Sequence, residues 1–67
     1  MMRIGKIKWF DKAKGQGFII TEDGKELFVH ETGISRADLA KIKDGEQVSF
    51  TIAEGKRGPQ AVDVKVV

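Results

Sequence analysis

The 67-residue sequence contains no cysteine and no tyrosine, and it has a single proline, histidine and tryptophan. Without cysteine, disulfides and thiolate zinc sites are excluded, and a reducing compartment is favoured, so we expect a cytoplasmic protein. No apolar run approaches the roughly 20 residues of a membrane span. Lysines interrupt the apolar residues of the N-terminal MMRIGKIKWF, so we expect no secretory signal there.

The chain length is that of one small domain, which we place over residues 1–67. A domain of this size buries only about 60% of the surface that its unfolded chain exposes. Because neither a disulfide nor a thiolate-bound metal can staple the fold, we expect its stability to be marginal.

The net charge of +2 is small, but the charges are unevenly distributed. Residues 3–14 carry one acid against five basic residues: Arg3, Lys6, Lys8, Lys12 and Lys14. Residues 22–31 show the reverse, with four acids against one lysine. A basic edge beside an acidic one suggests a polyanionic partner bound in one orientation. On charge alone, a surface that merely keeps the domain soluble explains the pattern equally well.

Alternation of apolar and polar residues predicts five short β-strands. They span residues 3–10, 15–21, 26–30, 47–53 and 60–66. The same alternation predicts a core built from Leu27, Val29, Val48, Phe50, Ile52, Val62 and Val64. Ala61 is predicted to face outward.

Turn signals and one long connection then favour an architecture. Asp23-Gly24 predicts a tight hairpin between the second and third strands. The long connection, residues 31–46, contains a capping box at 35–38 that predicts a helical turn. Five strands in so short a chain cannot form two packed sheets, whereas closing one sheet on itself removes the edges. We therefore predict an all-β fold, a five-stranded antiparallel barrel of the oligonucleotide-binding (OB) type. An SH3-like barrel fits the strand number almost as well, but the long connection favours the OB type.

The stretch KGQGFII, residues 14–20, places two glycines in front of a phenylalanine on a predicted strand. If Ile19 faces the core, Phe18 faces outward, and the tight hairpin makes Phe28 its neighbour. Exposed aromatic rings are unfavourable unless they are used. The glycines are explained if side chains there would lift a ligand off the rings. The alternative is that they only let a small barrel curve.

The direction of Trp9 and Phe10 stays open at this point. Consecutive strand residues face opposite sides, so only one of the two rings joins the core. Strict alternation from Ile7 buries Trp9, whereas a bulge would exchange the two. Lysines at positions 6, 8 and 14 flank these rings. Bases stack on flat aromatic faces and lysines follow phosphates, so this combination suits single-stranded nucleic acid.

Five segments together resemble a bacterial cold-shock protein, and the likeness covers essentially the whole chain. The segments are GKIKWF (5–10), KGQGFI (14–19), LFVH (27–30), DGEQVSF (44–50) and GPQA (58–61). The chain is thus identified as a single cold-shock domain, residues 1–67. The resemblance implies an OB barrel. It also implies an RNA chaperone or regulator of transcription or translation, often in adaptation to cold. The partners it implies are single-stranded RNA and DNA, with a preference for pyrimidine-rich stretches. From the residues themselves we expect no enzymatic activity and no cofactor or metal.

By this similarity Trp9 lies on the binding surface and Phe10 leans towards the core. Arg57 matches a position that contacts nucleic acid, Pro59 lies beside it, and Glu26 matches an acid that accepts hydrogen bonds from a base. The nucleic-acid-binding residues that we predict are Lys6, Lys8, Trp9, Lys14, Gln16, Phe18, Glu26, Phe28, His30, Arg57 and Pro59. Nothing in the sequence requires more than a monomer, and no membrane partner is expected.

Three residues depart from the family pattern. Gln16 stands where phenylalanine or tyrosine is usual, Glu31 replaces an aromatic residue, and Leu39 stands where phenylalanine is frequent. Each stacked base contributes about 1–3 kcal/mol, so we expect weaker binding than in typical relatives. Gln16 keeps two donors and an acceptor and is able to bond a base edge instead.

Other functions remain as alternatives. An enzyme is disfavoured because His30 and Glu31 are adjacent and would point apart on a strand. A metal site would need further nitrogen or sulfur ligands. The main alternative is a barrel that binds a protein, or structured RNA on the ribosome, and whose nucleic-acid face has decayed.

Overall fold

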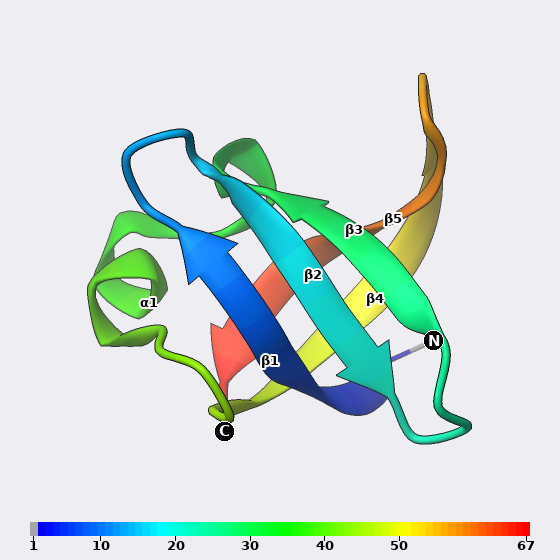
Figure 1. Ribbon diagram of the computed structural model, residues 1–67, viewed down its shortest axis with the longest axis horizontal. Helices are drawn as coiled ribbons and strands as arrows, with labels where there is room; N and C mark the ends of the chain where they lie inside the picture. Colours follow the sequence, from blue (N-terminus) through cyan, green and yellow to red (C-terminus); the bar gives the residue numbers. More distant parts are fainter. Residues whose placement is uncertain (1) are drawn as a thin grey trace.

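The computed structural model describes residues 2–67, which form five strands and two short helical segments (Figure 1). The strands are β1 (Arg3–Asp11), β2 (Gln16–Thr21), β3 (Glu26–His30), β4 (Gln47–Gly55) and β5 (Gly58–Val66). The 3-10 helix η1 (Glu31–Gly33) and the helix α1 (Arg36–Lys41) lie between β3 and β4. Each strand lies within two residues of its predicted limits, and a helix follows Ser35 as the capping box predicted.

The strands form a closed barrel in the order β1-β2-β3-β5-β4. This confirms the all-β, five-stranded barrel. One correction concerns direction: β3 and β5 pair in parallel, through Phe28 with Gln60 and Val29 with Ala61, while the other neighbours are antiparallel. Strand directions cannot alternate all the way around a closed ring of five strands, so a ring with four antiparallel neighbours has one parallel pair, which here joins β3 and β5.

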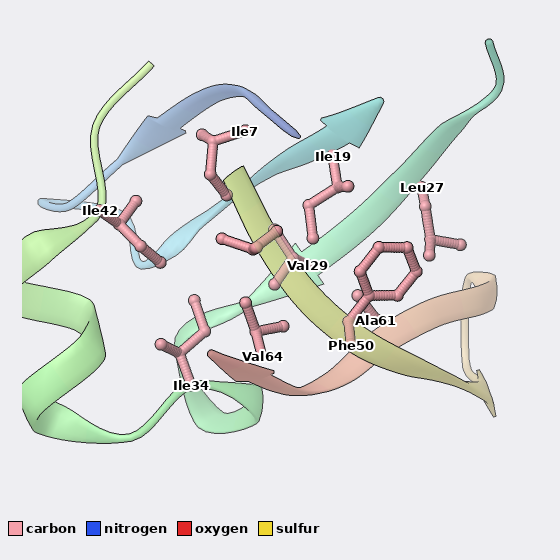
Figure 2. Packing of buried hydrophobic residues seen from close by; sticks show 10 residues of the cluster. Ile7, Ile19, Leu27, Val29, Ile34, Ile42, Phe50, Ala61 and Val64 are labelled. Atoms are coloured by element: carbon pink, nitrogen blue, oxygen red, sulfur yellow. The ribbon is translucent and has the colours of Figure 1, made fainter. Parts of the chain in front are cut away.

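Apolar side chains from all five strands and from the long connection fill the barrel (Figure 2). Alternation correctly predicted the inward residues of β2 and β3 and the first two of β4. The buried apolar residues are Ile7, Ile19, Leu27, Val29, Ile34, Ile42, Val48, Phe50, Ala61 and Val64. The core therefore leaves the outer faces of β1, β2 and β3 free for other uses.

Two predicted core residues lie outside this cluster. Ile52 is 42% exposed, because β4 continues with β5 into a hairpin that extends beyond the barrel (Figure 1). On β5, Asp63 has a φ of 52°, and the register with β4 shifts there. This bulge turns both Ala61 and Val64, three residues apart, towards the interior, so Val62 is half-buried and Ala61 is fully buried. A strict alternation cannot produce that spacing.

Asp38 joins α1 to the barrel. Its carboxylate accepts a hydrogen bond from the Ser35 hydroxyl (2.7 Å) and one from the Val66 backbone N–H (3.2 Å). The Ser35 hydroxyl in turn accepts the Asp38 N–H and caps the helix. These two hydrogen bonds to the ionised carboxylate lower the pKa of Asp38 below its ordinary value of 3.8.

We expect Asp38→Asn to lower the melting temperature at neutral pH, with a difference that shrinks in acid. Because the folded-state pKa of Asp38 is depressed, its stabilising effect is present above its ordinary pKa of 3.8 and is lost as the pH falls through the folded-state value. Melting temperatures of both proteins from neutral to strongly acidic pH measure this. Asp44→Asn, which removes the same charge from an exposed turn, is the control. A difference independent of pH would contradict the prediction.

Candidate nucleic-acid interface

A bulge in β1 decides which ring of the Trp9-Phe10 pair is exposed. Ile7 pairs with Ile19, but Trp9 pairs with Phe18, so Lys8 is an extra residue in the ladder. The extra residue turns Trp9 to the outer face, where it is 39% exposed, and turns Phe10 towards the core, against which it packs. The structure therefore agrees with the placement that the resemblance implied.

Three rings follow one another across the outer face of β1, β2 and β3, and we call them the aromatic surface: Trp9, Phe18 and Phe28. The Trp9 and Phe18 ring centroids are 5.5 Å apart, and those of Phe18 and Phe28 are 5.9 Å apart. Phe18 and Phe28 are directly opposite in the β2–β3 register, as predicted from the tight hairpin. Both are half-buried because the rings cover one another, and neither lies in the barrel interior.

The two glycines of KGQGFII have separate structural reasons. A Cβ on Gly17 would collide with the Trp9 carbonyl oxygen and lie 2.7 Å from the Phe10 Cα, so β1 and β2 approach too closely for any side chain. Gly15 has a φ of +71°, and the Glu31 carboxylate lies against its Cα face. Both positions therefore need glycine for the geometry of the bulge and the turn, whatever binds nearby.

Basic side chains surround the aromatic surface. Lys6 and Lys14 are exposed, on β1 and in the β1–β2 turn. The Lys8 ammonium forms a 2.5 Å ion pair with Glu26 on β3. Both partners are about half exposed, so the pair contributes little stability, and either side chain can leave it to pair with another charged group. The predicted residues Lys8 and Glu26 therefore lie together on this face.

Arg57 and Pro59, on the protruding β4–β5 hairpin, lie beside Phe28. The Arg57 guanidinium carbon is 5.0 Å from the Phe28 ring centroid, a cation–π contact. Pro59 lines a hollow with Phe18, Phe28 and Arg57. The hairpin thus brings a cation to the aromatic surface from the opposite side to the lysines of β1.

A second hollow, of about 370 Å³, contains the remaining predicted residues. Gln16 and His30 are opposite in the β2–β3 register and line it together with Phe28, Arg57 and Gln60. The Thr32 backbone N–H donates to Nδ1 of His30 (3.2 Å). Nδ1 is therefore the acceptor nitrogen, and the ring proton of the neutral imidazole lies on Nε2.

The three departures from the family pattern have different surroundings. Gln16 lines the hollow just described. Glu31 begins η1 and folds its carboxylate over Gly15. Leu39 lies in α1 and packs against the hydrophobic core, so its expected role as a missing stacking platform is not supported by its position.

Among the residues that line the two hollows, sequence reasoning did not name Gln60, Lys56 and Ile52 as site residues. Ile52 was assigned to the core, and Gln60 was read as a strand residue without a role. The parallel pairing of Phe28 with Gln60 brings the latter to the site. No local pattern signals that pairing, since it depends on how the barrel closes.

The comparisons with known proteins identify the family. The family model described as "'Cold-shock' DNA-binding domain" matches residues 3–67. The chain belongs to the cold-shock domain family. It is therefore a nucleic-acid-binding domain and not an enzyme.

Its curated relatives share about half of their residues with this cold-shock domain over nearly their whole length. The "Cold shock-like protein" of Thermotoga maritima is 51% identical over 63 residues, which cover 94% of this chain and 96% of the relative. "Cold shock protein CspD" of Bacillus subtilis is 49% identical with the same coverage. The solved structure "drosophila Unr CSD456" has a TM-score of 0.80 at 25% identity, and it matches 100% of this chain and 27% of that longer chain.

The structure of residues 2–67 also bears on metal binding and on membrane insertion. No group of three or more histidine, cysteine or acidic side chains is placed to hold a metal ion within this range. No helix in the same range has the length and apolar character needed to cross a bilayer.

Proposed function

We propose that this cold-shock domain binds single-stranded RNA and DNA by stacking bases on the aromatic surface while basic side chains contact the phosphates. The observation that carries the proposal is the continuous row of Trp9, Phe18 and Phe28, with centroid spacings of 5.5 and 5.9 Å, on an outer barrel face. Every base has a π-face, so such a row binds unpaired strands with little demand on sequence. A duplex keeps its bases stacked inside and cannot use it.

The predicted site residues divide by role in this proposal. Rings stack bases, cations meet phosphates, and polar side chains bond base edges. Lys6, Lys8, Lys14 and Arg57 supply the charge, Gln16, Glu26 and His30 supply hydrogen-bonding groups, and Pro59 adds apolar contact beside Phe28. In the cell we propose a monomeric, cytoplasmic RNA chaperone or regulator of transcription or translation under cold stress, with a preference for pyrimidine-rich strands.

We further propose that binding is weaker than in relatives with more rings. Gln16 provides no stacking face, and the Glu31 carboxylate near Gly15 adds a negative charge close to the path of the phosphates. We expect a lower affinity for oligothymidine than that of a relative with aromatic residues at the positions of Gln16 and Glu31. Titrations followed by tryptophan fluorescence, in the same salt for both proteins, measure this. Equal affinities would show that the missing rings are irrelevant.

Salt dependence tests the binding mode itself. With three or four phosphates neutralised, the logarithm of the binding constant should fall with the logarithm of salt concentration with a slope of about −2 to −3. Lys6→Gln should reduce the steepness by about 0.7. Lys65→Gln, on β5 outside the three strands that carry the rings, should leave it unchanged.

Two results would contradict this function. A binding constant independent of salt would favour an apolar protein partner, the main alternative to nucleic acid. Effective competition by a hairpin or duplex against an unstructured oligonucleotide would favour structured RNA instead.

A further inference from the structure

The hollow beside Phe28 contains three side chains able to read the edge of a base: Gln16, His30 and Gln60. Gln16 is opposite His30 across β2 and β3, and Gln60 is opposite Phe28 across the parallel seam. Hydrogen-bonding groups therefore lie next to a ring on which a base would stack. The volume of about 370 Å³ is in the range of small-molecule sites.

These groups are available to a ligand. Among residues 2–67, neither the Gln16 nor the Gln60 amide takes part in a side-chain hydrogen bond. The Gln60 side chain lies along Gly55. His30 uses Nδ1 for Thr32, so its Nε2–H remains as a donor with a defined tautomer.

The paired groups of Gln16 and His30 match a pyrimidine. An amide offers a donor beside an acceptor, and the His30 Nε2–H adds a second donor. The resulting order, donor–acceptor–donor, is the complement of the O4, N3–H and O2 atoms of uracil or thymine. Rotating the Gln16 amide by about 180° exchanges its donor and acceptor, and the pair then matches cytosine. On the corresponding edge of adenine the amide would pair with N6–H and N1, and the histidine donor would face C2–H and stay unmatched, which costs free energy when the group is buried by the ligand.

We infer that Gln16, together with His30, reads the hydrogen-bonding edge of one pyrimidine base next to Phe28; this rests on the proposed binding of single strands. A phenyl ring at position 16 would stack on any base. Glutamine instead distinguishes bases by their edges, so this domain loses some general affinity and gains selectivity at one position. Gln16 is then a specificity-determining residue rather than a lost stacking platform.

A double-mutant cycle between protein and ligand tests this. The ligands are hexathymidine and the same oligonucleotide with N3-methylthymine at every position, which still stacks but has no N3–H. Uniform modification prevents the strand from sliding an unmodified base into the hollow. The proteins are the wild type, Gln16→Leu and Gln16→Phe, with Gln47→Leu as a control on an exposed residue of β4. Melting temperatures of all four establish that they are folded.

Methylation should weaken the wild type and Gln47→Leu by about 10-fold, and the factor should be at least about threefold smaller for both Gln16 variants. Gln16→Phe should also bind unmodified hexathymidine about fivefold more tightly or better, since it adds a stacking ring. The same methylation factor in the wild type and in Gln16→Leu would overturn the inference. If the folded wild type bound neither oligonucleotide, the proposed function would fail, and the inference with it.

Discussion

Phe28→Ala is expected to weaken the binding of hexathymidine by about 10- to 100-fold, in line with the loss of one stacking platform. Phe28 occupies the centre of the site, because it contacts Phe18 on one side and lies under Arg57 on the other. It also lines both hollows, so its removal changes the surface of each of them. Titration followed by Trp9 fluorescence measures the change.

Phe28→Leu separates stacking from packing. Leucine keeps apolar contact with the neighbouring ring but offers no flat face, so its affinity should also fall by about 10-fold or more. Because Phe28 lies outside the core cluster, both variants should remain folded, which thermal unfolding checks. If either folded variant bound with wild-type affinity, the aromatic surface could not be the place where bases stack.

Gly17→Ala is expected to destabilise the domain by roughly 3 kcal/mol or more, as severe overpacking does. The added Cβ would meet the Trp9 carbonyl oxygen and the Phe10 Cα, which are backbone atoms on β1 and cannot rotate away. Relief requires β1 and β2 to separate at the bulge that exposes Trp9. A domain of this length is stabilised by about 3 to 10 kcal/mol in total, so the variant should lose a large part of its stability, and at the lower end of that range much of it should be unfolded at room temperature.

Gly55→Ala is the matched control. The same added atom would there meet the Gln60 side chain, including its Cδ at 2.7 Å, and that side chain can move aside. We expect a loss of less than about 1 kcal/mol, measured for both variants by urea denaturation followed with Trp9 fluorescence. Equal losses at the two positions would show that the close approach of β1 and β2 does not set the requirement for glycine.

The sequence predicted the elements well because strand periodicity and turn chemistry are local. The Asp23-Gly24 hairpin fixed the register of β2 and β3, and with it the contact of Phe18 and Phe28. Alternation failed where a bulge intervenes. The bulge at Lys8 left Trp9 and Phe10 undecided without the family resemblance, and the one at Asp63 reversed the assignments of Ala61 and Val62.

The rest of the site depends on closure of the barrel. Gln60 reaches Phe28 through pairing between strands that are far apart in sequence, and the exposure of Ile52 depends on where the β4–β5 hairpin leaves the barrel. Periodicity gives the direction of a side chain but not what covers it. For that reason the hollow of Gln16, His30 and Gln60 could not be predicted, although Gln16 and His30 were each named.

The parallel seam between β3 and β5 consists of two residue pairs, Phe28 with Gln60 and Val29 with Ala61. It is the shortest of the strand pairings in the barrel, so local opening should begin there, and the amides of this pairing should exchange faster than those of the other strand pairs. A base bound by Phe28 and His30 on one side and by Arg57 and Gln60 on the other would contact both sides of this pairing and stabilise it. The bound strand would then help to keep the barrel closed as well as occupy its surface.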